Sequence, residues 1–143
     1  MTPFDRDGVH FQYPANWTAE FNQDDESGGW AITVESPGTA FLLVSLRPDA
    51  ESPADLADQT LAALREEYDD LDVDDILQTL AGLPAIGHDI DFLTLDTAIS
   101  CWTQCIDTPA GPLLVMCQTS ELDREANEPL LRGVCASLTV DAE

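Results

Sequence analysis

The aspartates midway along the chain are the residues whose spacing best suits metal binding. Asp70, Asp72 and Asp74 alternate as the oxygen ligands of a calcium loop do, and such carboxylates can converge on a hard cation. That pattern also requires a glycine where Asp75 stands and a bidentate glutamate where Ala81 stands. We therefore interpret the run as a solvated acidic loop that enters a strand, rather than as a calcium site.

Four cysteines could supply thiol or soft-metal chemistry: Cys101, Cys105, Cys117 and Cys135. If Cys101 and Cys105 share a strand they point the same way, but their Cα atoms lie about 13 Å apart, which excludes a disulfide between them. If the chain turns near Gly111, Cys105 and Cys117 become cross-strand neighbours that could form a thiol pair or a soft-metal site. Zinc sites need further ligands close by, so we favour buried structural thiols.

The two histidines are the candidates for general acid–base catalysis. His88 shares a predicted strand with Asp89 and Asp91, but these carboxylates point to the opposite face and cannot orient its ring. His10 lies on the polar face of its own predicted strand. The sequence contains none of the common motifs of hydrolases, zinc proteases, dinucleotide-binding folds or phosphate-binding loops. We therefore predict no catalytic site, cofactor or metal.

A binding surface is the remaining kind of site that single residues suggest. Trp17, Trp30 and Trp102 each stand in an alternating, strand-like segment, which is typical of core residues. Trp102 shares its face with small and polar side chains, so we expect it to be the most exposed of the three. Partly exposed tryptophans are common at interfaces. The predicted interaction surface consists of Trp102 and the acidic run Asp69, Asp70, Asp72, Asp74 and Asp75.

The charge balance restricts the partners. The 143 residues include 28 acidic residues, five arginines and no lysine, which gives a formal net charge of −23. Such a surface repels phosphate backbones, so nucleic acids are disfavoured. The charge suits a basic partner or a cation, but net charge bears on solubility and association rather than on sites, so we favour a solvated surface, as in a salty cytoplasm. The acidic residues are spread along the whole chain rather than gathered in a tail.

Length and composition predict one domain, residues 1–143, with enough chain to bury a core without disulfides. No apolar run approaches the roughly 20 residues that a membrane helix needs, and the first residues do not form a secretory signal. Four cysteines in such a chain are expected to be free thiols. We therefore expect a cytoplasmic protein that does not bind membranes.

The elements that would position these residues begin with strands. Residues 9–13 and 17–21 alternate between apolar and polar side chains, and Pro14 between them predicts a hairpin turn. Residues 30–35 alternate in the same way. Residues 40–46 are apolar on both faces, which predicts a central strand covered on both sides.

The period then changes to that of a helix. Ser52 and Pro53 form a helix start, and the helix should end near Tyr68. A four-stranded meander follows, and a second helix should begin after Ser120, with a kink or restart at Pro129. The meander strands and a short last strand are predicted at residues 76–80, 85–95, 98–106, 112–118 and 138–140. The result is an α+β fold with helices on both sides of an antiparallel sheet.

The opening pattern Gly8-Val-x-Phe-x-Tyr-Pro-x-x-Trp17, the capped helix, the meander and the closing Ser137-Leu-Thr-Val140 resemble the PsbP-like superfamily. That group includes the extrinsic protein of photosystem II, a Ran-binding nuclear import factor, effector-associated chaperones and uncharacterised bacterial proteins. The resemblance implies an α/β/α sandwich over nearly the whole chain. It also implies a binding or assembly factor rather than an enzyme. No position matches a family motif that carries chemistry, so no functional residue is transferred.

Three functional hypotheses follow from the sequence. The first is a non-enzymatic protein-binding or accessory domain of a bacterial cytoplasmic protein, with a protein partner of unknown identity. The second is an effector-type chaperone that uses an apolar groove of the same fold. The third is a thiol- or metal-dependent enzyme that uses Cys105 and Cys117. The sequence does not indicate the oligomeric state.

Overall fold

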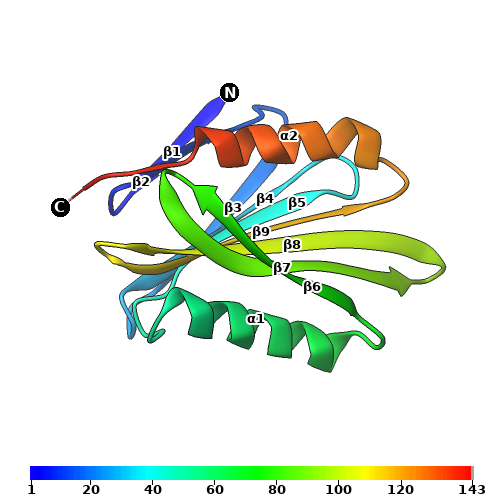
Figure 1. Ribbon diagram of the computed structural model, residues 1–143. Helices are drawn as coiled ribbons and strands as arrows, with labels where there is room; N and C mark the ends of the chain where they lie inside the picture. Colours follow the sequence, from blue (N-terminus) through cyan, green and yellow to red (C-terminus); the bar gives the residue numbers. More distant parts are fainter. Residues whose placement is uncertain (143) are drawn as a thin grey trace.

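The computed structural model describes residues 1–142 and is shown in Figure 1. A seven-stranded antiparallel sheet in the order β3-β4-β5-β9-β8-β7-β6 carries helix α1 on one face. Helix α2 and a three-stranded sheet, β1-β2-β10, cover the other face. The elements are β1 (Thr2–Arg6), β2 (Val9–Tyr13), β3 (Thr18–Asp24), β4 (Gly29–Glu35), β5 (Phe41–Leu46), α1 (Pro53–Glu67), β6 (Asp72–Leu80), β7 (Leu83–Thr94), β8 (Thr97–Thr108), β9 (Gly111–Ser120), α2 (Arg124–Ser137) and β10 (Thr139–Val140).

This arrangement confirms the predicted α+β class and the helices on both faces. It also confirms the meander, which is β6 to β9. Strand β9 is the central strand of the large sheet, and β5 lies beside it, in agreement with their apolar residues on both faces. Neither helix in the described part of the chain has the length and apolar character needed to span a membrane.

The predicted N-terminal hairpin is wrong. Strand β2 pairs with β1 and β10, whereas β3 pairs with β4 in the large sheet. The turn between β2 and β3 is tight, since the Trp17 amide donates to the Pro14 carbonyl at 3.0 Å, but it directs the chain from one sheet to the other. The sequence pattern described the strands correctly and could not show which partner each would choose.

Strand β1 was not predicted, because its five residues include a proline and two charged side chains and do not alternate as a core strand does. Its Phe4 stacks on Phe11 of β2 at 5.0 Å between ring centroids and lies 5.2 Å from Trp30 of β4. These aromatic contacts join the small sheet to the large one. Phe4, together with the buried Val9 and Phe11 of β2, therefore packs the small sheet into the main core.

Helix α1 begins and ends as predicted. The Ser52 hydroxyl accepts a hydrogen bond from the Asp55 amide at 3.1 Å, Pro53 is the first helical residue, and Tyr68 is the C-cap. The buried side chains of the helix, Leu56, Ala57 and Leu64, face the sheet, and the helix contacts β7, β8 and β9.

Helix α2 differs from the prediction at its start. It begins at Arg124 with Asp123 as N-cap, while Ser120 ends β9 and accepts a hydrogen bond from the Leu122 amide at 3.3 Å. The helix continues through Pro129 and buries Leu131 and Val134 against β9 and β2. Of the predicted kink or restart at Pro129, the restart is therefore wrong, because tertiary packing holds the helix together across the proline.

The two helices do not lie back to back. Helix α1 crosses the β7–β9 half of the sheet, whereas α2 lies over β9 and next to β2, as Figure 1 shows. On the face that carries α2, strands β6 and β7 are consequently left without a helix above them. This uncovered part of the sheet positions the candidate site.

Candidate functional site

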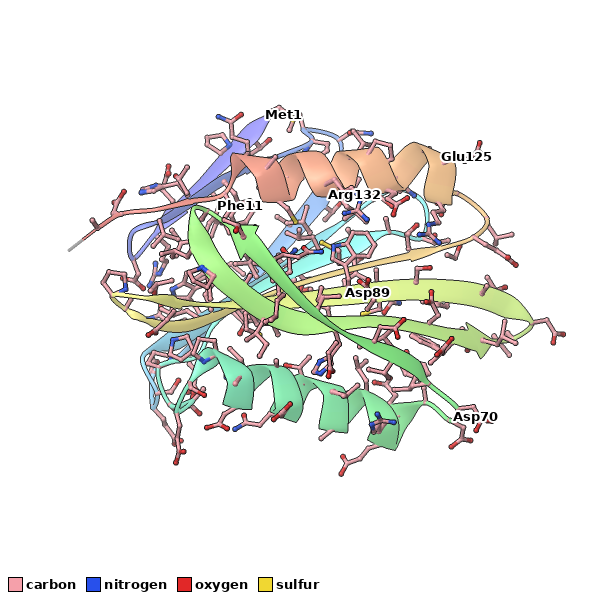
Figure 2. All side chains as sticks on the ribbon, in the orientation of Figure 1. Met1, Phe11, Asp70, Asp89, Glu125 and Arg132 are labelled. Carbon is pink, nitrogen blue, oxygen red and sulfur yellow. The ribbon has the colours of Figure 1, made fainter. Side chains whose placement is uncertain are left out.

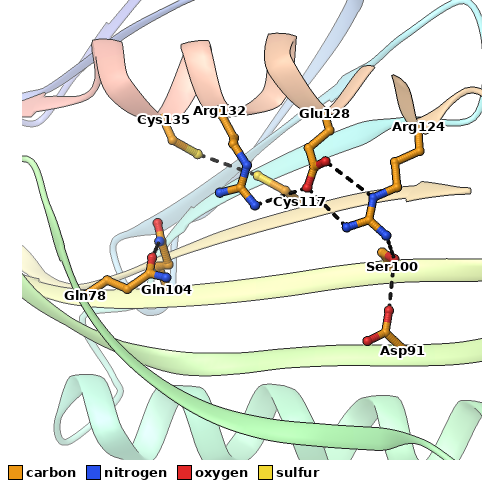
Figure 3. A network of polar contacts seen from close by, with 9 residues as sticks. All are labelled: Gln78, Asp91, Ser100, Gln104, Cys117, Arg124, Glu128, Arg132 and Cys135. Atoms are coloured by element: carbon orange, nitrogen blue, oxygen red, sulfur yellow. Dashed lines mark hydrogen bonds and ion pairs between the residues drawn. The ribbon is translucent and has the colours of Figure 1, made fainter. Parts of the chain in front are cut away.

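A cleft of about 450 Å³ lies where α2 meets the β6–β8 half of the sheet. Trp102 and Gln104 of β8 line it from the sheet side, and Arg132 and Cys135 line it from the helix. The β6–β7 turn, which contains Ala81, closes one end. Figure 3 shows Gln104, Arg132 and Cys135 from close by, and all three side chains are polar or able to react.

The antiparallel register continues this site across the sheet as rows of neighbouring residues. Asp74 of β6 lies opposite Asp89 of β7, and Asp89 lies opposite Trp102. The next row pairs Asp72 with Asp91. Like charges placed directly across an antiparallel pair destabilise the sheet. Two such pairs stand side by side on the uncovered face, and all four side chains are exposed.

Trp102 is the most exposed of the three tryptophans, as expected, but only by a narrow margin over Trp17 at 6% and Trp30 at 3%, and it is buried. Its exposed fraction is 7%, because the Arg132 guanidinium of α2 stacks over the ring at 5.1 Å from its centroid. Figure 2 shows Arg132 and Asp89 on the same side of the sheet. The small neighbours of Trp102 on its strand make room for this arginine, which strand alternation alone does not reveal. Trp102 still borders the cleft, as a wall rather than a protruding contact.

A polar network fixes the helix side of the site, as Figure 3 shows. Glu128 accepts hydrogen bonds from Arg124 at 3.3 Å and from Arg132 at 3.1 Å. These guanidinium groups, Arg124 foremost, lower the pKa of Glu128 below its usual value. Arg124 also donates to the Ser100 hydroxyl at 3.0 Å, and Ser100 donates to Asp91 at 2.9 Å. The network therefore links α2 to the acidic rows of the sheet.

Gln104 provides an unused acceptor beside the cleft. Its side-chain amide donates to the Gln78 side chain, and its exposed fraction is 8%. The Gln104 Oε1 atom has no hydrogen-bond partner within the described residues. A buried carbonyl oxygen without a donor is costly. A donor group on a bound molecule would satisfy it.

Cys105 and Cys117 are not cross-strand neighbours, so the alternative of a thiol pair or soft-metal site between them is wrong, and both are buried as favoured. Cys105 lies opposite Leu114 and packs beneath α1, whereas Cys117 lies opposite Trp102 on the other face of the sheet. Burial raises the pKa of Cys105 to about 12, and that of Cys101 to the same value. The sulfur that approaches Cys117 belongs instead to Cys135, at 3.7 Å between the two Sγ atoms. No spacing in the sequence relates a residue of a strand to a residue of the helix that packs on it, so the sequence did not predict this pair.

The structure divides the predicted acidic surface. Asp72 and Asp74 share the face of Trp102. Asp75 lies on the α1 face beside His88, with 3.3 Å between Asp75 Oδ1 and His88 Nε2. The remaining pair, Asp69 and Asp70, lies in the loop between α1 and β6.

Strand β6 begins at Asp72, four residues before the predicted strand. Asp72 and Asp74 therefore lie on one face of an extended strand and Asp75 on the other, rather than around a turn where their carboxylates could converge on one cation. Among residues 1–142, no group of three or more His, Cys, Asp or Glu side chains is placed to hold a metal ion. The predicted interaction surface did not include Asp89 and Asp91. Strand alternation could have identified them, because it places both side chains on the face of the strand that His88 does not occupy.

His10 lies far from the cleft, on the small sheet. Its Nδ1 atom is 2.6 Å from Asp5 Oδ1 and its Nε2 atom is 2.9 Å from Asp141 Oδ2. Both carboxylates raise the pKa of His10, Asp141 more than Asp5. This histidine therefore links β1, β2 and the C-terminal segment. It does not line the cleft.

No protein-family model matches the chain, and no curated protein matches it in sequence. Its fold is nevertheless shared with solved structures. The PsbP protein (CyanoP) of the cyanobacterium Synechocystis superposes with a TM-score of 0.65 at 14% identity, covering 98% of this chain and 92% of that chain. The chain therefore has a PsbP-like fold, as predicted.

Two further structures show the same fold. A protein of unknown function from Pseudomonas aeruginosa matches with a TM-score of 0.61 at 14% identity, over 100% of this chain and 99% of that chain. LpqN of Mycobacterium tuberculosis, which is involved in cell envelope biogenesis, matches with a TM-score of 0.59 at 12% identity, over 97% and 89%. At these identities the likeness establishes the architecture and carries no site residue.

Proposed function

We propose that this PsbP-like domain is a non-enzymatic protein-binding module that holds a basic, extended segment of its partner across the uncovered face of the sheet. The observation that carries the proposal is the pair of rows in which Asp72 faces Asp91 and Asp74 faces Asp89. Each row lowers the stability of the free domain. Positive side chains of a partner would turn this repulsion into attraction.

Protection of a sheet edge does not explain all four carboxylates. Strand β6 is an edge strand, and charged residues on such strands discourage unwanted pairing. Strand β7 is interior, because it pairs with both β6 and β8. Asp89 and Asp91 therefore have no edge to protect. Their position opposite the β6 carboxylates supports a role in binding.

The adjoining cleft supports an extended peptide segment, rather than a lone cation, as the ligand of this face. An extended chain presents alternate side chains at a repeat of about 6.5 Å, twice the rise per residue. Such a chain could set basic groups over the acidic rows while another side chain enters the cleft and donates to Gln104. The net charge of −23 opposes a nucleic acid as the partner.

The surroundings of the histidines support a binding role over catalysis. Neither His10 nor His88 lines the cleft. His10 is engaged by two carboxylates on the small sheet, and His88 lies on the α1 face. A general base must reach the proton that it removes. A cytoplasmic location stays a prediction, to which the four free thiols lend support.

The test is selection from a displayed library of random peptides at about 0.15 M salt. We expect the wild-type domain to enrich peptides with alternating arginine or lysine. The variant in which Asp72, Asp74, Asp89 and Asp91 are all replaced by Asn should bind these peptides at least about tenfold more weakly. A matched control removes four exposed carboxylates elsewhere: Asp25→Asn, Glu26→Gln, Glu51→Gln and Asp58→Asn.

The control should keep most of the affinity if the site, and not total charge, holds the peptide. Equal loss in both variants would reject the site. Enrichment of acidic or uncharged peptides would reject the proposed partner class. The fourfold Asn variant should also melt at a higher temperature than the wild type, because two repulsive pairs are removed. That readout shows independently that the variant is folded.

A second candidate, the chaperone, is favoured by one observation. An apolar hollow of about 500 Å³ lies beside the start of α1 and is lined mainly by Leu77, Leu83, Pro84 and Ile86. Leu77 is 81% exposed at its rim. If the hollow shields apolar segments, Leu77→Asp should abolish suppression of aggregation of a synthetic apolar peptide, and the control Leu95→Asp should not. A wild-type domain without any such suppression would exclude this role.

A further inference from the structure

A thiol pair that the proposed binding function does not use lies at the wall of the cleft. Cys117 of β9 and Cys135 of α2 lie with their Sγ atoms 3.7 Å apart. Cys117 is fully buried, whereas Cys135 is partly exposed and lines the cleft. A disulfide has its sulfurs about 2.05 Å apart, so these two are reduced and in contact. A relative movement of roughly 1.7 Å would bring them to bonding distance.

The two thiols differ in reactivity. The Cys117 thiol donates to Cys135, and Arg132 lies one helical turn before Cys135, so the pKa of Cys135 is lowered. The same contact and burial raise the pKa of Cys117. Cys101 and Cys105 are buried under α1 with pKa values raised to about 12. Cys135 is therefore the one thiol of the four that combines access with thiolate character.

We propose that Cys135 is a modification site for small disulfides and that Cys117 resolves the mixed disulfide into an internal Cys117–Cys135 bond. The inference does not depend on the proposed binding function. It rests on the sulfur–sulfur contact and on the cleft that opens to only one of the two sulfurs. Gln104, buried beside it with an unpaired Oε1, offers the incoming molecule a hydrogen-bond acceptor.

The chemistry balances with the small disulfide as the oxidant. The Cys135 thiolate attacks one sulfur of the disulfide, a new S–S bond forms, and the other half leaves as a thiolate that takes up a proton. Cys117 then loses its proton and attacks Cys135 Sγ, which releases the second half as a thiol. The two protein thiols are oxidised by two electrons, and one small disulfide is reduced to two thiols.

The surroundings select the charge of that disulfide. Asp89 lies opposite Trp102, which lines the cleft, and Asp74 lies one strand further out in the same row. Anionic disulfides are repelled at this rim and cationic ones are attracted. Arg132 does not reverse this preference, because Glu128 pairs with it at 3.1 Å. Cystamine, a small dication, should therefore react faster than oxidised glutathione, and the difference should shrink at high salt.

The experiment treats the native, reduced protein with cystamine and follows its intact mass. The wild type should lose the mass of two hydrogens and keep no adduct, and dithiothreitol should reverse the change. Cys117→Ser should instead retain one half of cystamine at Cys135, because the resolving thiol is missing. Cys135→Ser should stay unmodified while folded. The control Cys101→Ser/Cys105→Ser should behave as the wild type does.

Three results would overturn the inference. One is a wild-type protein that stays reduced under conditions in which all four thiols react after unfolding in urea. Another is modification of Cys101 or Cys105 before Cys135, located by peptide mapping. The third is a Cys117→Ser protein that forms no adduct. If that variant does not fold, the melting temperatures of the cystamine-treated and the reduced wild type are compared instead. A bond between β9 and α2 should raise the melting temperature, and an unchanged value would reject the bond.

Discussion

His10 is the residue with the most direct consequence for solution behaviour. Both of its ring nitrogens face carboxylate oxygens, Asp5 at 2.6 Å and Asp141 at 2.9 Å. A neutral imidazole has one N–H and can donate to only one of them, whereas the imidazolium donates to both. The folded state therefore favours the protonated ring, and the pKa of His10 is raised above its usual 6.5.

We predict that stability falls as the pH rises through the folded-state pKa of His10. A raised pKa gives stability that is complete below the unfolded value of about 6.5 and is lost as the pH rises from there through the raised pKa of the folded state. Thermal unfolding of the wild type from about pH 5.5 to about pH 8 should show a falling melting temperature. His10→Gln should flatten this profile. If both proteins show the same slope, the imidazolium does not hold the C-terminal segment to β1.

The acidic rows show how a residue-scale feature depends on pairing. Strand alternation places Asp89 and Asp91 on the face of β7 that His88 does not occupy. It also places Asp72 and Asp74 on one common face, once the strand is taken to begin at Asp72. The repulsive contact of Asp74 with Asp89 needs the register of β6 on β7 as well. Register is set by the two-residue turn at Ala81 and Gly82, both with positive φ.

At the scale of elements, α2 contains the clearest local conflict. Pro129 is the sixth residue of the helix, so the Glu125 carbonyl lacks its helical donor. The helix persists because Leu131 and Val134 are buried in the core. Local propensity is a weak preference, and a packed apolar face overrides it.

We predict that Pro129→Ala raises the free energy of unfolding by about 2 kcal/mol, because a helical hydrogen bond is restored and the proline penalty is removed. Pro129 is exposed, so the change creates no cavity. Urea denaturation measures the gain. Pro129→Gly serves as the control, since it restores the amide but has poor helix propensity, and its gain should be smaller by about 1 kcal/mol. A Pro129→Ala protein no more stable than the wild type would contradict this account.

At the scale of the whole molecule, charge dominates. A net charge of −23 on 143 residues repels itself most strongly in the compact state. We predict that the melting temperature rises clearly between low and molar salt, because screening weakens that repulsion. NaCl and KCl should act alike, and an uncharged osmolyte of equal osmolarity should not reproduce the low-salt part of the rise. A flat response to salt would reject self-repulsion as a limit on stability.

The offset of the two helices is the other whole-molecule property. Because α1 covers β7 to β9 and α2 lies over β9 and beside β2, the α2 face is open over β6 and β7. The cleft, the acidic rows and the partly exposed Cys135 all lie at this boundary. A helix centred over β8 would have buried the four carboxylates without partners, which is prohibitively costly.

The sequence by itself determined the element types, the central strands, the capped start of α1 and the meander, because these follow from local side-chain periods and capping residues. The tertiary structure alone decided that β2 and β3 belong to different sheets, that Arg132 covers Trp102, and that Cys117 contacts Cys135 instead of Cys105. Each of these contacts joins segments far apart in the chain, through the choice of strand partner or the placement of a helix. Alternation along one strand assigns a side chain to a face, but packing across the sheet decides what that face meets.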